Sequence, residues 1–221
     1  MLTINIPERL FILTIDDEQG AIVASVKTLL PYGLAGATLA DLALTNKIQL
    51  HDDRLVLVDP TPVGDAWFDE ILADIATEQK PRKLSRWVEA IGRKQIVKKV
   101  ASHLIARNVI RVEKKRYLWV IPYEVYPKVD ASAKYWVKQQ LRGIVLAGVK
   151  AEAPDIALLS LLKACSLLRL LFTRDERKYA SQKVDALVKG EVFGKAVAKL
   201  LEEMEAAMIA MTVAVTTAAY S

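Results

Sequence analysis

Residues 39–60 read LADLALTNKIQLHDDRLVLVDP, a stretch in which a helical pattern gives way to a strand pattern. Its first part carries leucines at helical spacing, and its second part holds two short apolar strands on either side of an HDDR turn. Shifted by 62 residues, it aligns with residues 101–122. The matched pairs are Leu42 with Leu104, Asn46 with Asn108, Ile48 with Ile110, Arg54 with Arg116, Val58 with Val120 and Pro60 with Pro122. Each copy predicts a helix, an asparagine in a left-handed helix cap, and a β-hairpin.

The other long segments have the apolar spacing of helices. They are residues 65–78, 83–91, 93–107 (RKQIVKKVASHLIAR, taken as one helix), 131–149, 154–172, 173–190 and 191–220. The leucine-rich segment 154–172 is expected to be a hydrophobic central helix. The apolar run at 206–220 has 15 residues, fewer than the roughly 20 that cross a bilayer, and is expected to be a buried core helix. The chain is therefore predicted to be mainly α, a single globular helical domain over residues 1–221 with two small β-hairpins.

Several classes of chemistry are disfavoured by the residues present. The one cysteine, Cys165, excludes an intramolecular disulfide and a cysteine-based zinc site, and the two histidines, His51 and His103, fall in different copies of the repeat. The chain has no glycine-rich phosphate loop, no HExxH motif and no nucleophile elbow. The start MLTINIPERLFIL lacks the features of a signal peptide. These observations predict a cytoplasmic protein that is not an enzyme and that uses no metal or cofactor.

Charge is divided unevenly along the chain. Residues 15–78 hold twelve Asp/Glu against three Lys/Arg, a net charge of −9, while residues 80–116 hold thirteen Lys/Arg against two Glu, a net charge of +11. A charge run is usually a solvated face, yet a cationic window of this length also suits an anionic partner. Membrane phosphates and nucleic acid both qualify.

The second copy of the repeat differs from the first at its predicted turn. HDD in the first copy becomes EKK in the second, and Leu55 and Leu57 become Tyr117 and Trp119. Aromatic rings beside cations are typical of interfacial loops, with the rings at headgroup depth and the cations on phosphates. The hairpin is therefore predicted to face anionic lipid through Lys114, Lys115, Arg116, Tyr117 and Trp119.

The predicted helix before this hairpin is also basic. Its apolar residues fall on one face, which leaves Lys94, Lys98, Lys99 and His103 pointing outward. Lys94 and Lys98 would lie one helical turn apart, so both are expected to contact lipid phosphate.

Two other functions are compatible with the same pattern. A basic helix followed by a basic hairpin also describes a winged-helix nucleic-acid binder. Nucleic acid is the less favoured partner, because the helix offers mostly lysine where base recognition uses Arg, Asn or Gln. The acidic segment 15–78 could also capture basic tails of membrane proteins, as an adaptor would. The oligomeric state is not predicted.

Several motifs resemble the Golgi phosphoprotein 3 family over essentially the whole chain. They are LFILTIDDEQGAI, GLAGATLADLALTNKIQL, PVGDAWFDEIL, KLSRWVEAI, the basic helix with its hairpin, and IALLSLLKACSLLRLLF. The resemblance implies a mainly α fold and a peripheral membrane protein that binds phosphatidylinositol 4-phosphate. In eukaryotes it also implies an adaptor that holds the cytosolic tails of Golgi glycosyltransferases.

The family's headgroup residues are only partly present. Val26 stands where the family has a Trp, Ala35 where it has an Arg, and Val97 at the second of two basic helix positions, while Lys94 keeps the first. The nearby cations Lys27, Arg93 and Lys98 could replace the lost charge. General affinity for anionic lipid, with weak preference for the 4-phosphate, is therefore expected. About nine residues precede LFILTI in place of the long extension of eukaryotic members, which favours a prokaryotic member.

Overall fold

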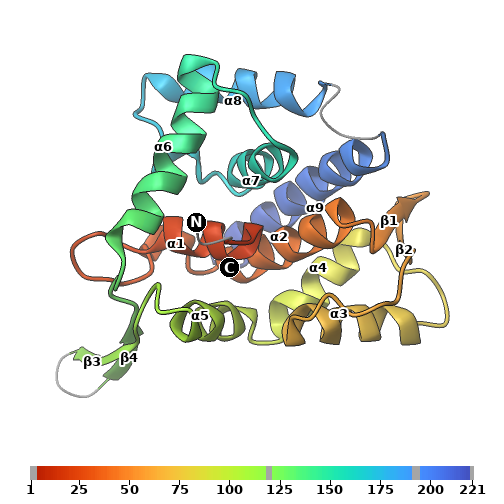
Figure 1. The fold of residues 1–221 in the computed structure, drawn as a ribbon, viewed down its shortest axis with the longest axis horizontal. Coiled ribbons are helices and arrows are strands. Elements are labelled where there is room, and N and C mark those ends of the chain that lie inside the picture. The colour runs from red at the N-terminus through yellow and green to blue at the C-terminus, as the bar shows by residue number, and fades with distance from the viewer. Residues whose placement is uncertain (1–3, 118–120, 191–194, 220–221) are drawn as a thin grey trace.

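The computed structural model describes residues 4–117, 121–190 and 195–219, and Figure 1 shows that helices dominate it. The predicted mainly α fold with two small hairpins is confirmed. The elements are α1 (Ile6–Thr14), the 3-10 turn η1 (Ala24–Val26), α2 (Leu30–Leu44), β1 (Ile48–His51), β2 (Arg54–Leu57), α3 (Ala66–Thr77), α4 (Leu84–Arg93), α5 (Ile96–Ala106), β3 (Glu113–Tyr117), β4 (Ile121–Val125), α6 (Ala131–Ala147), α7 (Ala153–Ala164), η2 (Leu168–Leu170), α8 (Glu176–Val188) and α9 (Lys195–Ala219).

Two apolar helices, α2 and α7, occupy the middle of the molecule (Figure 1). α2 packs against α1, α4, α5, α7 and α9. Gly36 permits this close packing, because a Cβ atom there would lie 2.9 Å from the sulfur of Met204 and 3.0 Å from Leu161. α7 is the expected leucine-rich central helix, but it ends at Ala164. Ser166 then adopts a left-handed conformation, so the helix is shorter than the predicted segment 154–172.

Both asparagine caps are present as predicted. Asn46 has φ 58° and Asn108 has φ 57°, and each follows the last turn of its helix. The next amide donates back across the cap, from Lys47 to the Leu42 carbonyl at 2.8 Å and from Val109 to the Leu104 carbonyl at 2.9 Å. This six-to-one bond is a Schellman motif. In both copies, the chain therefore has the same backbone conformation directly after the helix.

The first hairpin, β1–β2, has the predicted two-residue turn. Its strands pair from Ile48 with Leu57 to His51 with Arg54. Asp52 and Asp53 between them both have positive φ, at 45° and 61°. A turn of this kind requires the left-handed conformation twice, and aspartate tolerates it better than most residues.

The second hairpin contradicts the turn expected from the repeat. β3 pairs with β4 from Glu113 with Val125 to Tyr117 with Ile121, so Lys114 and Lys115 lie inside a strand. The physical reason is turn chemistry: two lysines do not favour the left-handed conformations that a two-residue turn demands. The repeat therefore holds for the helix and its cap, whereas the hairpin register is different and the ribbon extends beyond residue 122.

The basic helix expected over residues 93–107 is broken near its start. α4 ends at Arg93, Gln95 has φ 56°, and α5 begins at Ile96. Lys94 therefore lies at the junction of two helices and not one turn before Lys98 on the same helix.

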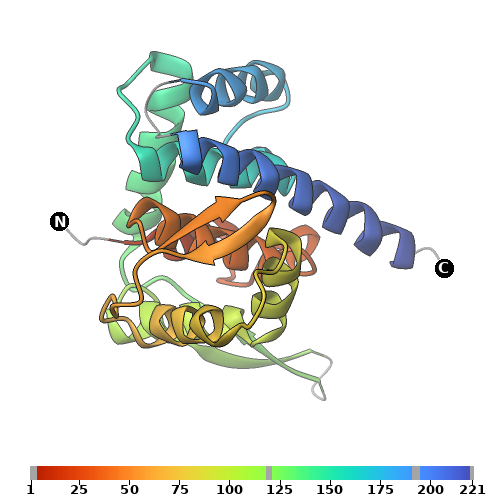
Figure 2. The same cartoon turned by 90° about the vertical axis from the view of Figure 1, so that its right-hand side faces the viewer.

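The expectation that residues 206–220 form a buried core helix was wrong for most of that run. α9 buries Leu200, Leu201, Met204 and Met208, but its last turns extend beyond the body (Figure 2). Among the described residues, no helix combines the length and the apolar content needed to cross a membrane.

Candidate functional site

Three of the predicted lipid-binding residues meet at the junction of α4 and α5. Arg93, Lys94 and Lys98 line one open hollow, together with Glu70, Gln95, Lys99 and Ser102. The left-handed Gln95 creates this arrangement, because it redirects the chain between the two helices. The first turn of α5 then places its lysines beside the end of α4. Four cations thus surround one hollow that contains a single carboxylate, Glu70.

Two of these cations are held by acidic residues of α3. Lys94 forms an ion pair with Asp74 and lies 3.6 Å from Glu70, and Lys99 forms an ion pair with Glu70. The hydrogen bond to Asp74 raises the pKa of Lys94, and the hydrogen bond from Lys99 lowers the pKa of Glu70. An incoming phosphate would therefore compete with these carboxylates for Lys94 and Lys99.

The other two cations differ in their availability. Arg93 is exposed and pairs with Glu89 of its own helix at 2.6 Å. Lys98 is also exposed, and no ion pair or side-chain hydrogen bond of the described part of the chain involves it. Lys98 is the cation of the hollow that is most available to a ligand.

The remaining predicted positions near the headgroup site are not part of this hollow. Lys27 is exposed directly after η1 and does not line it. Val26 and Ala35, the positions that were predicted to correspond to the family Trp and Arg, are both 0% exposed and face the core. Val97 is half-buried against the core. The structure thus brings three cations together and leaves Lys27 apart from them.

The predicted hairpin residues lie on the β3–β4 ribbon. Lys114, Lys115 and Arg116 are all exposed. Because side chains alternate along a strand, Lys114 and Arg116 lie on one face of the ribbon and Lys115 on the other. Tyr117 is the last residue of β3, and its side chain, like the whole of Trp119, is outside the described residues.

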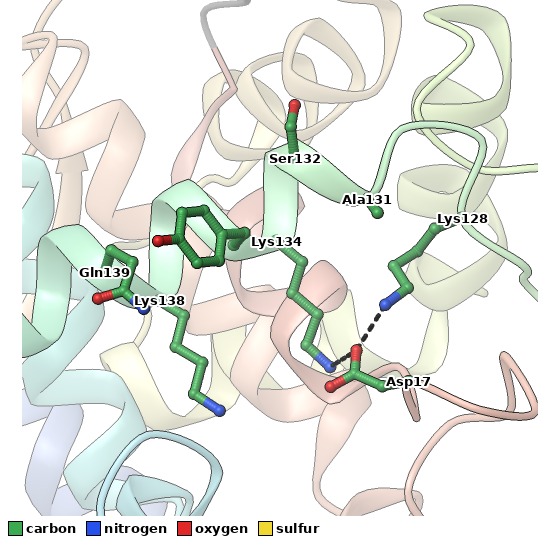
Figure 3. Close-up of a pocket in the computed structure, with 8 residues that line it drawn as sticks. Asp17, Lys128, Ala131, Ser132, Lys134, Lys138 and Gln139 are labelled. Carbon is green, nitrogen blue, oxygen red and sulfur yellow. Dashed lines mark hydrogen bonds and ion pairs between the residues drawn. The ribbon is translucent and has the colours of Figure 1, made fainter.

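A second cationic hollow was missed by the sequence reasoning. Asp17 lies between Lys128 and Lys134, with oxygen–nitrogen distances of 2.6 and 2.9 Å, and Lys138 lines the same hollow (Figure 3). Burial alone would raise the pKa of Asp17, but the hydrogen bonds from the two lysines lower it overall. The available signal was the segment 128–138, KVDASAKYWVK, in which lysines flank a Tyr–Trp pair.

The acidic and basic segments of the chain partly neutralise each other in the fold. Lys83 pairs with Asp53 at 2.8 Å, Arg82 pairs with Glu78 at 2.5 Å, and His103 lies 3.2 Å from Asp65. The charge asymmetry read from the sequence therefore overstates the charge available to partners. No group of three or more potential metal ligands occurs within the described ranges.

The fold and its sites define a helical protein with two hairpins and clustered surface cations. The family model for Golgi phosphoprotein 3 (GPP34) matches residues 6–204, and the chain belongs to this family. It is similar to "Vacuolar protein sorting-associated protein 74" of Eremothecium gossypii, with 23% identity over 167 residues. That match covers 65% of this chain and 50% of the relative, so the chain spans about half the length of the curated relative it matches.

Proposed function

We propose that this protein is a non-enzymatic peripheral membrane protein that binds anionic phospholipid headgroups from the cytoplasmic side. The observation that carries the proposal is the open hollow where Arg93, Lys94, Lys98 and Lys99 converge. Each cation near an anionic membrane surface contributes about 1 kcal/mol of binding free energy, so a cluster gives useful affinity.

The residues of the hollow are suited to bind negatively charged lipid in general and not one particular headgroup. Three of its four cations are lysines, which act as point charges and do not form the paired hydrogen bonds that arginine makes with phosphate. The family resemblance suggests phosphatidylinositol 4-phosphate as a ligand. With Val26 and Ala35 buried, we expect only a weak preference for this lipid over other anionic lipids.

The β3–β4 ribbon is the second membrane contact in this proposal. Lys114, Lys115 and Arg116 would lie against phosphates, with Tyr117 or Trp119 at headgroup depth. The ribbon supports this role because its strands leave the body and expose all three cations (Figure 2).

We further propose that the protein is an adaptor that binds the tails of membrane proteins. The family is named for a Golgi phosphoprotein and the relative for vacuolar protein sorting, which supports work at internal membranes. Basic tails of membrane proteins would then bind carboxylates of the acidic segment 15–78. Because several of these carboxylates already pair with lysine or arginine, we expect tail binding to be weak without a membrane.

The test is co-sedimentation with neutral, phosphatidylglycerol and phosphatidylinositol 4-phosphate vesicles. Lys98→Glu should lower the affinity for both anionic vesicles about tenfold. Glu70→Gln should raise it about fivefold, because it releases Lys99 and removes one of the two carboxylates near Lys94. Lys178→Glu makes the same charge change at an exposed residue of α8. Because α8 lies on the opposite side of the molecule from α4 and α5, this variant should bind vesicles almost as well as the native protein (Figure 1).

Duplex DNA serves as the competitor in the same assay. Equal losses from Lys98→Glu and Lys178→Glu would mean that total charge, and not the hollow, drives binding. Displacement from vesicles by DNA at matched charge, with a steep dependence on DNA length, would instead favour a nucleic-acid binder.

A further inference from the structure

The end of α9 is apolar and exposed, an unusual combination for a protein in water. Ile209 is 50% exposed and Val213 is 59% exposed, and both follow Met208, the last buried residue among the described side chains of the helix. The family match ends at residue 204, just before this part of the helix. The feature is thus outside the segment that the family model matches.

This helix end carries no charge on any side. From Ala206 to Ala219 the chain consists of Ala, Met, Ile, Val and Thr, which is nearly four helical turns without a charged residue. A helix that is uncharged all round is normally buried or in contact with lipid. The nearest preceding carboxylate, Glu205, is paired with Lys163 at 2.6 Å.

Two threonines of this helix end, Thr212 and Thr217, have hydroxyl groups that are already hydrogen-bonded to the helix backbone. The hydroxyl of Thr212 donates to the Met208 carbonyl at 2.8 Å, and that of Thr217 donates to the Val213 carbonyl at 2.8 Å. A hydroxyl bonded to its own helix costs much less to remove from water than a free hydroxyl.

The direction of the helix end indicates what it meets. In Figure 2 the end of α9 and the β3–β4 ribbon leave the body on the same side. A surface that approaches this side would meet basic residues at the ribbon and apolar residues at α9, which is the combination that an anionic lipid interface requires.

We infer that the last turns of α9 insert into one leaflet of the membrane and form an apolar anchor on the side of the molecule to which the basic ribbon also extends. This inference rests on the proposed function. Residues 209–219 extend about 16 Å at 1.5 Å per residue, similar to half of the roughly 30 Å hydrocarbon core. Lipid fits better than a second copy of this chain, because one partner helix would cover only one side of a helix that is uncharged on all sides.

The experiment places a polarity-sensitive nitrobenzoxadiazole dye on Val213→Cys and adds phosphatidylglycerol vesicles. The native thiol does not interfere, because burial raises the pKa of Cys165 to about 12 and keeps it unreactive. We expect a blue shift, at least a twofold rise in fluorescence, and quenching by nitroxide on the lipid acyl chains. The same dye on Tyr179→Cys, an exposed site on α8, should not respond.

Two further variants separate the anchor from the charges. Ile209→Ser with Val213→Ser should lower vesicle affinity about tenfold and abolish the binding that survives in high salt, since salt screens charges but not apolar contacts. Because both side chains are at least half exposed, the melting temperature should not change.

The outcomes are distinguishable. If the protein sediments with vesicles while the dye at position 213 stays unchanged, the anchor is refuted and the proposed function stands. If no variant sediments with any anionic vesicle, the proposed function fails and the anchor with it. A dye response without lipid that rises with protein concentration, together with a doubled mass in light scattering, would assign α9 to a second copy and overturn the inference.

Discussion

The two hairpins of this protein each follow the same kind of helix cap, but the first packs against the body of the protein and the second extends into solvent. β1–β2 is fixed to the body: the Leu84 amide donates to the Asp53 carbonyl at 3.1 Å, and the Leu55 amide donates to the Arg82 carbonyl at 2.9 Å. β3–β4 is held at its base, where the Tyr126 amide donates to the Gly20 carbonyl at 2.6 Å. Beyond that base its strands extend away from the helices (Figure 1).

A repeated motif can therefore keep the same backbone conformation at the helix end while the role of its surface changes. In the first hairpin Ile48 and Leu55 are buried, so its sequence is constrained by packing. In the second, Lys114, Lys115 and Arg116 are exposed, so their identity is not explained by the core. Residues that the fold does not require are the better candidates for binding.

The largest expected effect is on the second hairpin. Changing Lys114, Lys115 and Arg116 together to Ser should weaken phosphatidylglycerol vesicle binding about a hundredfold, at roughly 1 kcal/mol per cation. The melting temperature should stay within about 1 °C, because all three side chains are exposed. Co-sedimentation and thermal unfolding of the same samples measure both quantities.

The comparison variant on the first hairpin is Asp52, Asp53 and Leu55 to Ser, in which Asp52 and Asp53 are the counterparts of Lys114 and Lys115 and Leu55 is the counterpart of Tyr117. It should leave vesicle binding intact below the melting temperature, yet cost about 2 kcal/mol or more of stability because Leu55 is 2% exposed. Equal losses of binding from both triple variants would remove the distinction between the hairpins. A large fall in melting temperature from the second-hairpin variant would make that hairpin part of the core.

The parts of the fold that depend on local sequence could be predicted, and those that depend on contacts between distant segments could not. The helices, the caps at Asn46 and Asn108 and the Asp52–Asp53 turn are set by local patterns and could be predicted. The break at Gln95 could not, because nothing in its neighbours demands a left-handed residue there, and tertiary packing of α4 and α5 decides it.

The candidate site was predictable in composition but not in arrangement. The sequence located the cations Arg93, Lys94 and Lys98, yet the carboxylates that hold Lys94 lie on α3, some twenty residues earlier. Ion pairs between distant segments leave no local signature. The hollow around Asp17 was missed for the same reason, since Lys128 and Lys134 approach it only in the folded chain.

A second contrast between the copies lies in their helices. Asp41 and His103 occupy equivalent positions, and both reach α1: the Ile6 amide donates to Asp41 at 2.8 Å, and His103 Nδ1 lies 2.8 Å from Glu8. Burial raises the pKa of Asp41 to about 7, although the Ile6 amide and Arg9 oppose the rise.

This shift predicts a pH-dependent stability. The unfolded chain releases the Asp41 proton near pH 4 and the folded chain near pH 7, so stability falls as pH rises between these values. Asp41→Asn keeps an acceptor for the Ile6 amide and has no charge to bury. Between pH 4 and pH 8, the free energy of unfolding of this variant should rise by up to about 2 kcal/mol relative to the native chain. This is half of the roughly 4 kcal/mol that a pKa shift of three units would allow. Urea unfolding at both pH values measures this gain, and a constant difference would contradict the buried carboxylate.

The smallest expected effect tests whether the two caps are equivalent. Asn46 and Asn108 are both exposed and have nearly the same φ, so a substitution there changes mainly the backbone. Replacing either by Ala should cost about 1 kcal/mol, the strain of a left-handed alanine, while replacement by Gly should change stability by no more than about 0.5 kcal/mol. Urea unfolding of the four variants gives the comparison.

An equal loss of stability from the two Asn→Ala variants would mean that both copies depend on the same left-handed helix cap. The copies would then differ only in the surroundings of their strands. The Asn108 variants give the sharper result, because α5 carries Lys98 and the cap fixes where the basic ribbon begins. Asn108→Ala should therefore weaken vesicle binding slightly more than Asn46→Ala at equal loss of stability. If Asn108→Ala costs only a few tenths of a kcal/mol while Asn46→Ala costs about 1 kcal/mol, the second cap is not required to hold the ribbon, and the contrast between the hairpins begins at the helix end.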